Sequence, residues 1–476
     1  MKTGFSRRDF IGSLLASAAS GGCASGGKWW FGEMPRIKFG VISDIHITTP
    51  ESTDRFRIAL ARYRDLGADA VIVAGDLTDW GLKSSLQFMA DAWNDVFPDD
   101  RGADGEKVAK LFVTGNHDLD GWRYGDMTLD MHTQGYSEDE AMSKLGIEKC
   151  WREVFGEPYG KMRIRTVKGY QFVSAQWHGN DDAEIAAWLG QNSSRLNSTG
   201  NPFFFFRHYP IPGTGIRSPR SNMLTEAFRS LPDAVVFTGH THQTFFDERA
   251  IWQDGFTSVA IPSMSYTGVP KGYENGSASR RGDEAVGMER IDSRERLLQP
   301  QGFFVKVWDD RMEIERYDYS RMKIAASPWV VPLGAGRAEP FALGERIKTL
   351  PVPQFPEGAA LETYVTNSDT RNALWRIFMT LEFPAAGNET ARAYDYEIRV
   401  EFADGRTGAV KRFLSPGFYR LPDEDDKVMR FRFDCMDLPE RGKYRFAVYP
   451  RNSLGVYGRP IVSKVFESKP GREKAV

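Results

Sequence analysis

Five short apolar runs in this chain each end in a group of Asp, Asn or His side chains, and these groups hold five of the chain's seven histidines. The runs are β-branched or aromatic, which predicts buried strands. Because ligands of open α/β sheets bind beyond the carboxyl ends of the strands, we expect the five groups to meet at one place. Carboxylate and imidazole donors together suit Mn, Fe, Co or Zn. The runs and the groups that follow them are 36–42 with Asp44 and His46, 70–74 with Asp76, 110–114 with Asn116 and His117, 203–206 with His208, and 234–238 with His240 and His242.

The length of 476 residues is too great for one ordinary domain and predicts two. Acidic and basic side chains nearly balance, with 62 Lys and Arg against 64 Asp and Glu, so no overall positive field favours a nucleic-acid partner. The three cysteines, Cys23, Cys150 and Cys435, form neither a CxxC pair nor a disulfide framework. We therefore interpret Cys150 and Cys435 as free thiols.

Residues 36–318 alternate apolar runs with stretches of helical periodicity, which is typical of an α/β domain, and we place this domain at residues 28–325. A hairpin of 303–308 and 312–317 is expected to close this domain. Segment 268–301 is rich in Gly, Arg and Glu, and is either a solvated surface loop or a flap over the site. The expected helices are 53–66 and 221–230, with Thr53 and Ser221 as their N-caps, together with 84–96 and 181–194.

A different pattern follows the α/β domain. Residues 326–356 are rich in proline and are interpreted as a linker. Residues 357–476 show short alternating strands, with Asp404-Gly405 as the clearest hairpin turn, which predicts a β-sandwich. The end of this region, residues 438–455, resembles the closing strands of a fibronectin type III domain.

Residues 1–27 are interpreted as a twin-arginine export signal, because Ser6-Arg7-Arg8-Asp9-Phe10 precedes a short, mildly apolar stretch rich in Ala, Ser and Gly. That stretch is far shorter than the roughly 20 residues of a membrane-spanning helix. Cys23 follows small residues, as at a lipoprotein cleavage site; the alternative is an ordinary residue of the leader. We expect an exported protein, periplasmic or at the cell surface, which is either soluble or held by one lipid at Cys23.

The five polar groups also carry a resemblance to a known family. Asp44-x-His46, Gly75-Asp76-x-x-Asp79, Gly115-Asn116-His117-Asp118, His208 and Gly239-His240-x-His242 are similar in order and spelling to the motifs of the calcineurin-like metallophosphoesterases, over residues 36–318. The resemblance implies two packed β-sheets flanked by helices, two bound divalent ions (Mn, Fe, Zn or Co), and hydrolysis of a phosphate ester by a hydroxide that bridges the ions. It also implies that Asp44, His46, Asp76 and His242 would hold one ion, and Asp76, Asn116, His208 and His240 the other.

The same resemblance implies that His117 faces the leaving oxygen as an acid, and that Asp79 orients His117 and raises its pKa. Asp118 is expected to shape the turn. Trp80 and Asp118 stand where the Ser/Thr phosphatases of the family carry Arg and Glu, and Asp79 stands where purple acid phosphatases carry Tyr. The spelling is more similar to the cyclic-nucleotide and glycerophosphodiester phosphodiesterases of the family.

Five further side chains are weaker candidates for contact with the substrate. An arginine near His208 could bind a phosphate oxygen, although a solvated arginine is the default interpretation. A tryptophan could stack on a base or sugar, or pack within its own loop. A histidine after another strand-like run could line the pocket, or be a capped loop residue. These candidates are Arg207, Arg217, Arg220, Trp80 and His178.

The sequence therefore predicts an exported dinuclear-metal phosphoesterase that acts on a small phosphate ester, with a phosphodiester favoured by motif spelling. The rival enzymes are a phosphomonoesterase and a nucleotide-sugar pyrophosphatase. The rival from another class is a non-catalytic, metallophosphoesterase-like binding protein at the cell surface. The oligomeric state does not follow from the sequence.

Overall fold

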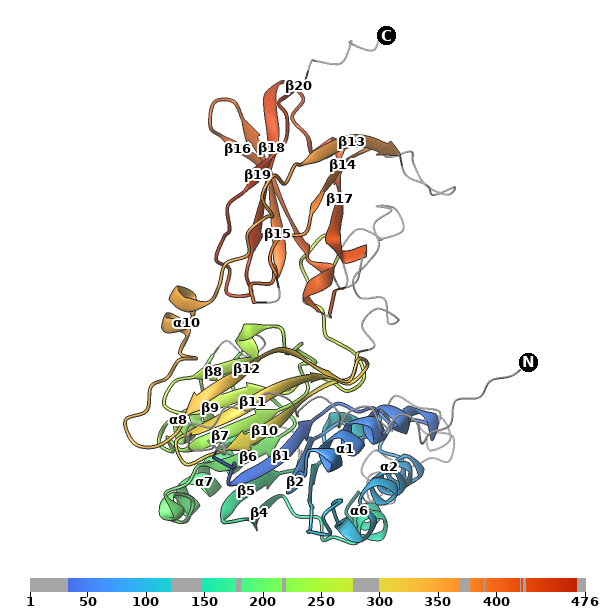
Figure 1. The fold of residues 1–476 in the computed structure, drawn as a ribbon, viewed down its shortest axis with the longest axis vertical. Helices are drawn as coiled ribbons and strands as arrows, with labels where there is room; N and C mark the ends of the chain where they lie inside the picture. The colour runs from blue at the N-terminus through green and yellow to red at the C-terminus, as the bar shows by residue number, and fades with distance from the viewer. Residues whose placement is uncertain are drawn as a thin grey trace, which may run out of the picture. The chain divides into compact units, whose positions relative to one another are not determined.

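Two six-stranded β-sheets form the first domain (Figure 1). The computed structural model describes residues 33–120, 147–176, 181–215, 220–276, 299–367, 377–388, 390–419, 421–422 and 425–468. In the first sheet, three parallel strands continue into three antiparallel ones, in the order β12-β11-β10-β1-β2-β3. Its strands are β1 (Ile37–Ile42), β2 (Ala70–Ala74), β3 (Ala109–Val113), β10 (Gln301–Val307), β11 (Arg311–Asp318) and β12 (Lys323–Pro332).

The second sheet has the order β4-β5-β6-β7-β9-β8, with parallel pairing from β5 through β9. Its two edge strands, β4 and β8, each pair antiparallel to their neighbour. The strands are β4 (Met162–Val167), β5 (Tyr170–Ala175), β6 (Phe203–Arg207), β7 (Ala234–Thr238), β8 (Ile251–Gln253) and β9 (Thr257–Ala260).

The run of four phenylalanines in β6 shows how the layers are built. Phe204 and Phe206 point between the two sheets, where they join the core that holds Phe39 of β1. Phe203 and Phe205 point to the opposite face and pack in a separate core. This alternation is the two-residue period of a strand that is buried on both faces.

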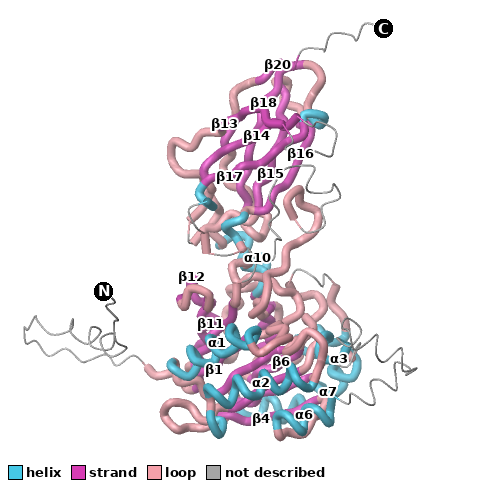
Figure 2. The backbone as a smooth tube through the Cα atoms, turned by 90° about the vertical axis from the view of Figure 1, so that its right-hand side faces the viewer, coloured by secondary structure: helices cyan, strands magenta, loops and turns pink. Residues whose placement is uncertain are grey.

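Helices cover the outer face of each sheet (Figures 1 and 2). One set packs its apolar face on the first sheet, and the other packs on the second sheet. Among the described residues, no helix combines the length and the apolar character that crossing a bilayer requires. The first set is α1 (Asp54–Asp65), α2 (Lys83–Val96) and α6 (Ile147–Phe155), the second is α7 (Asp182–Leu196) and α8 (Met223–Arg229), and the short α3 (Asn116–Asp120) follows β3.

The C-terminal domain is all-β apart from short helical turns. Two antiparallel sheets enclose one apolar core, in the orders β13-β14-β17 and β16-β15-β18-β19, with β20 also paired to β18. The predicted turn at Asp404-Gly405 joins β15 to β16, and Gly405 has a left-handed φ of 86°. The strands are β13 (Glu362–Asn367), β14 (Ile377–Pro384), β15 (Asp395–Phe402), β16 (Thr407–Leu414), β17 (Val428–Asp434), β18 (Gly442–Arg451), β19 (Ile461–Val462) and β20 (Phe466–Ser468).

This architecture confirms the predicted fold class, a two-sheet α/β domain followed by all-β sheets. The hairpin at the end of the first domain forms as β10 and β11, and Cys150 and Cys435 are free thiols. The export signal at 1–27 lies outside the described residues and stays a prediction.

The first sheet extends further than the sequence predicts. The proline content predicts a linker at residues 326–332, but these residues belong to β12, which pairs with β11. Trp329 and Val331 are buried while Val330 is exposed, so the segment alternates as an edge strand does. Pro328 and Pro332 obscure this alternation in the sequence, yet an edge strand tolerates proline. The linker proper contains only α10 (Leu343–Thr349).

Two predicted helix caps also differ from the structure. Thr53 precedes α1, but its hydroxyl donates to the carbonyl of Pro50 and makes no cap bond. The cap of α8 is Asn222 rather than Ser221, because the Asn222 side chain accepts from the backbone N–H groups of Leu224 and Thr225. Asparagine and serine are nearly equivalent as caps, so the sequence could not separate these neighbours.

We predict that Gly40→Ala lowers the free energy of unfolding by about 1–3 kcal/mol, the usual cost of overpacking a core. A β-carbon at Gly40 of β1 would lie 2.3 Å from Cε2 of Tyr63, which is fully buried. That ring cannot retreat easily, because its hydroxyl donates to the carbonyl of Phe303 at 3.0 Å. Urea denaturation followed by circular dichroism measures the change.

The matched control is Gly190→Ala in α7, where an added β-carbon meets no atom within 4 Å. This substitution should stabilise the protein by up to about 1 kcal/mol, because alanine is the better helix former. Equal losses in the two variants would contradict the packing argument.

Candidate metal centre and active site

All seven predicted metal ligands lie in the described part of the chain, at the carboxyl ends of five strands. Three of the strands belong to the first sheet and two to the second, so the site lies where both sheets end. Asp44 and His46 follow β1, Asp76 follows β2, Asn116 begins α3 after β3, His208 follows β6, and His240 and His242 follow β7.

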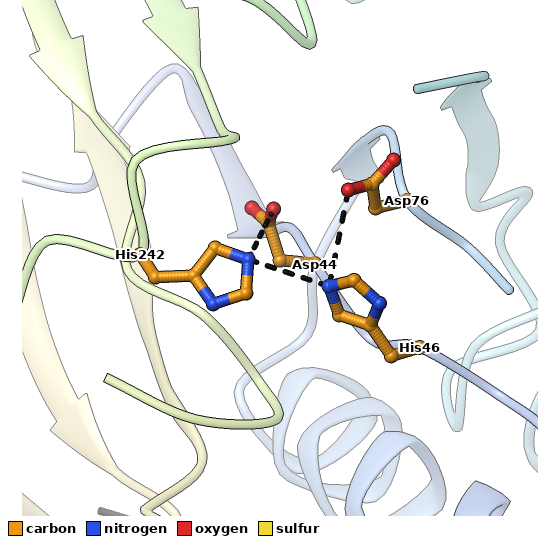
Figure 3. A group of neighbouring side chains, drawn as sticks. All are labelled: Asp44, His46, Asp76 and His242. Atoms are coloured by element: carbon orange, nitrogen blue, oxygen red, sulfur yellow. Dashed lines mark hydrogen bonds and ion pairs between the residues drawn. The ribbon is translucent and has the colours of Figure 1, made fainter. Parts of the chain in front are cut away.

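Four of these residues form one group, Asp44, His46, Asp76 and His242, whose donor atoms lie within 4.8 Å of one another. Figure 3 shows the two carboxylates and the two imidazoles turned toward a common point. His242 Nε2 lies 2.9 Å from Asp44 Oδ1 and 3.3 Å from His46 Nε2. His46 Nε2 lies 3.8 Å from Asp76 Oδ2. The group therefore has the members predicted for the first ion.

A second group shares Asp76 with the first and adds His208 and His240. His208 Nε2 lies 3.2 Å from Asp76 Oδ2. Asn116 Oδ1 lies 3.1 Å from both His208 Nε2 and His240 Nδ1. The amide oxygen thus completes a second set of four donors, as predicted for the second ion, and Asp76 is common to both sets.

Backbone carbonyls fix which nitrogen of two imidazoles faces the centre. A carbonyl only accepts, so Nδ1 of His242 must donate to Tyr266 O at 2.9 Å, and Nδ1 of His208 to Ala74 O at 3.0 Å. In the neutral rings, the Nε2 lone pair of each then points at the carboxylates. Lone pairs and carboxylates that converge in this way need a cation between them.

The ionisation of the buried groups reflects this concentration of acceptors. Burial alone would raise the pKa of Asp44, but the imidazole of His242 holds it well below the usual range. Burial alone would lower the pKa of His208, yet the carboxylate of Asp76 raises it to about 9. Burial and the neighbouring His208 lower the pKa of His240 to about 4. The carboxylates therefore favour positive charge at His208, whereas His240 stays neutral beside it.

Five of the predicted ligands have a left-handed backbone. Among the described residues, nine that are not glycine have positive φ, and these five make up more than half of them. Such conformations are rare and cost free energy, so the surrounding structure must enforce them. The five, with their φ angles, are Asp44 (53°), His46 (54°), Asp76 (47°), His240 (68°) and His242 (50°).

Two glycines leave room for the ligands. A β-carbon at Gly75 would lie 2.6 Å from Nδ1 of His208, and one at Gly115 would lie 2.2 Å from Oδ1 of Asp76. Both distances are far below van der Waals contact. The glycines in these motifs therefore allow the strand ends to approach the donor atoms closely.

The structure divides the predicted role of Asp79 between two histidines. Its carboxylate Oδ1 lies 2.5 Å from Nδ1 of His46 but 3.7 Å from Nδ1 of His117. His117 Nδ1 instead donates to the backbone carbonyl of Asp79 at 3.0 Å. The Asp79 side chain thus orients a ligand first, while its backbone orients His117.

The weaker substrate candidates have different outcomes. Arg207 is buried and donates to Asp182 and to the carbonyls of Tyr209 and Pro210, so its guanidinium holds the loop after β6 together. Trp80 is 37% exposed, next to Asp79 in the chain, and Arg220 is also exposed. His178 and Arg217 lie outside the described residues.

Sequence reasoning missed two tyrosines beside the centre. Tyr209 stacks on His240, with ring centroids 4.0 Å apart and planes 19° apart. Tyr266 lies against His242 at 4.2 Å and is 42% exposed. The position of Tyr209, directly after His208, was a usable signal. Tyr266 follows a sixth strand end, after β9, which carries Ser and Tyr rather than metal donors.

Residues 37–244 match the family model described as calcineurin-like phosphoesterase. The first domain of this chain has the fold of the metallophosphoesterases, an α/β sandwich of two sheets, and is similar to this family over the matched residues. The match includes all seven candidate ligands, together with Asp79 and His117, and ends two residues after His242.

No curated protein matches the chain significantly. Among solved structures, the phosphoesterase domain is similar to a dimetal phosphatase from Danio rerio, at 12% identity and a TM-score of 0.36, over 62% of this chain and 98% of that one. It is also similar to a purple acid phosphatase from yellow lupin seeds, at 11% identity and a TM-score of 0.39, over 63% of this chain and 54% of that one.

The donor set of the phosphoesterase domain fits two divalent ions. Two carboxylates, one amide oxygen and four imidazoles form two sets of four donors around a shared carboxylate, and oxygen and nitrogen donors of this mixture bind several transition metals. The identity of the metal depends on supply and does not follow from these residues.

We predict that Asp79→Asn weakens metal binding by about tenfold or more, the usual cost of losing the partner that orients a ligating histidine. The asparagine would no longer offer a carboxylate to Nδ1 of His46. Titration with Co²⁺, followed by visible absorption, measures the affinity.

Asp95→Asn is the matched control, because Asp95 is an exposed carboxylate on α2 that pairs only with Arg57 in the structure described. It should leave Co²⁺ affinity unchanged. Unchanged affinity in Asp79→Asn, with turnover alone reduced, would return Asp79 to the predicted role of acting through His117.

Proposed function

We propose that this protein is a metal-dependent phosphoesterase that hydrolyses phosphodiesters. The observation that carries the proposal is the meeting of seven donors in two sets around Asp76, within a calcineurin-like phosphoesterase domain. Two divalent ions held there would acidify a water to serve as the nucleophile and would neutralise charge on the phosphoryl oxygens.

His117 is the side chain that we assign to the leaving group. Its Nδ1 is bound to the carbonyl of Asp79, which makes Nε2 the nitrogen that would pass a proton to the leaving oxygen. The ring lies 4.8 Å from that of His46, edge to face, so it stands beside the first group of donors. His117 is adjacent to the ligands but belongs to neither set of four donors. This position suits a general acid better than a metal ligand.

The surroundings of the centre support a diester rather than a monoester. A monoester carries nearly two charges at neutral pH, and arginine forks are the usual partners for that extra charge. Arg207 is engaged in its own loop, and Arg55 donates to the carbonyls of Ile45 and His46. Within the part of the chain that the structure describes, the aromatic rings of Tyr209 and Tyr266 lie beside the ligands.

We also propose that the protein acts outside the cytoplasm on a small phosphate ester. This proposal is supported by the sequence alone, through Arg7-Arg8 and the small residues before Cys23. The balanced charge of the chain gives no reason to invoke nucleic acid.

Protein without residues 1–27, loaded with Mn²⁺, should hydrolyse bis-p-nitrophenyl phosphate with a higher kcat/KM than p-nitrophenyl phosphate. Chelation should abolish both activities, and Mn²⁺ should restore them. A preference for the monoester would instead favour a phosphomonoesterase. No turnover of either substrate, with two ions bound, would favour the binding-protein alternative.

We predict that His117→Ala retains metal but loses about 10²–10⁴-fold in kcat on a diester with an alkoxide leaving group, the usual contribution of a general acid. The loss should be much smaller with p-nitrophenolate, which leaves without being protonated. Parallel assays with the two leaving groups, and a Co²⁺ titration of the same variant, test this. An equal loss of kcat on both substrates would contradict the role of His117 as a general acid.

A further inference from the structure

The C-terminal domain contacts the segment that supplies two of the ligands, His240 and His242. Both domains belong to one structural unit, Pro35–Val476. We call residues 239–246 the ligand segment. Its residues Phe245 and Phe246 share an apolar core with Tyr419 of the C-terminal domain, so the two domains bury surface together at this point.

Gln301, at the start of β10, connects the ligand segment to the C-terminal domain. Its side chain is 1% exposed. Oε1 accepts from Thr244 Oγ1 at 3.1 Å and from the backbone N–H of Phe245 at 3.3 Å, and Nε2 donates to the carbonyl of Tyr419 at 3.2 Å. One amide thus satisfies partners on both sides of the domain boundary.

Two further contacts strengthen this junction just beyond His242. The guanidinium carbon of Arg249 lies 4.5 Å from the ring centroid of Tyr394, while the same guanidinium pairs with Asp247. Arg392 lies over the ring of Phe246 at 4.0 Å. Cation–π contacts of this kind are strongest where both partners are partly desolvated.

A third anchor holds the other side of His242. The N–H of Gly268 donates to the carbonyl of His242 at 2.7 Å. The segment that begins at Gly268 runs to Asn275, which exchanges two hydrogen bonds with the backbone of Leu414, at 2.8 and 3.0 Å. The part of the predicted loop 268–301 that the structure describes, up to residue 276, is therefore tied to β16 at Asn275, while Lys271 and Gly272 are exposed.

The side chains between and beside the two ligands also face the C-terminal domain. Thr241 and Gln243 line a cavity of about 40 Å³ together with Tyr394 and Tyr419. The rear of the ligand segment thus borders residues of the second domain.

These contacts restrain a part of the ligand segment whose backbone conformation is unfavourable by itself. His240 and His242 both have left-handed φ, which costs free energy and persists only where the surroundings enforce it. The bonds that Gln301 and Thr244 make to the carbonyl of Tyr419 supply such contacts from the C-terminal domain. The bonds between Asn275 and Leu414 add a second such contact.

We propose that the C-terminal domain is part of the scaffold of the metal centre, and that Gln301 is a positioning residue for His240 and His242. The domain holds the ligand segment in its binding geometry, so that loosening the junction releases metal. This role goes beyond the proposed hydrolysis, because it concerns retention of the ions and holds whatever the substrate.

The test is Gln301→Met in the full chain, since methionine keeps the size of the side chain without its hydrogen bonds. The matched control is Gln253→Met. Gln253 is also 1% exposed, and its amide likewise accepts from a backbone N–H, that of Phe341, and donates to Thr257. Co²⁺ titration by visible absorption and thermal denaturation are measured on each variant.

We expect Gln301→Met to weaken Co²⁺ binding by about tenfold, as loss of an outer partner of a metal site does. Gln253→Met should lower the melting temperature to a similar extent with unchanged Co²⁺ affinity. Wild-type affinity in Gln301→Met, or equal weakening in both variants, would overturn the proposal. If Gln301→Met does not fold, Asn275→Ala decides by the same criterion, because it removes both bonds to Leu414.

The outcomes also separate this proposal from the proposed function. Wild-type protein that binds no Co²⁺ would overturn the metal centre and the scaffold role together. Wild-type protein that binds Co²⁺ but turns over no phosphate ester would overturn only the proposed hydrolysis.

Discussion

The buried carboxylate of Asp76 is the constraint on which the site depends. Its Oδ2 lies near His208 and His46, one from each group of donors, and its Oδ1 accepts from the backbone N–H of His117 at 2.9 Å. Its backbone carbonyl accepts from the N–H groups of Ile45 and His46. One residue thus joins the ends of β1, β2, β3 and β6. A carboxylate this deeply buried is costly unless cations or donors surround it, so the fold must bring those partners to it.

Asp118 shows how that requirement reaches the neighbouring turn. Burial, with the charge of Asp76 nearby, raises the pKa of Asp118 to about 6. Four donors offset this cost: the backbone N–H groups of Gly115, Leu77 and Thr78, and the hydroxyl of Thr78. These bonds tie the loop after β2 to the loop after β3. The predicted role of Asp118 in shaping the turn is confirmed, and the bonds that satisfy its carboxylate are the bonds that perform this role.

The sequence predicts the donor sets well because strand order and side-chain chemistry are both local signals. A run such as 70–74 that ends in Gly75-Asp76 carries its strand, its end and its ligand within seven residues. The Asp79 carboxylate lies about one ångström closer to His46 than to His117. The spacing of these residues in the sequence does not predict so small a difference in distance. Tyr266 was missed for a related reason, because its contribution is a backbone carbonyl that any residue could offer.

The domain boundary was harder to predict, because composition and topology disagree there. Residues 326–332 have the proline content of a linker and the alternating burial of an edge strand, and the pairing with β11 decides between them. Segment 268–276 likewise has the composition of a loop, but its conformation is set by Leu414, 139 residues away from Asn275 along the chain. Contacts between residues this far apart in the chain form only in the folded structure. They produce no periodic pattern in the sequence from which they could be predicted.

The position of the domain junction has a consequence for the centre as a whole. Two of the five strand ends serve both groups: the end of β2 supplies the shared Asp76, and the end of β7 supplies a separate ligand to each group, His242 to the first and His240 to the second. A restraint on the end of β1 or β6 would act on the residues of one group, whereas a restraint on the segment after β7 acts on both. The C-terminal domain meets the site at this segment. A single junction between the domains can therefore set the geometry of both donor sets at once.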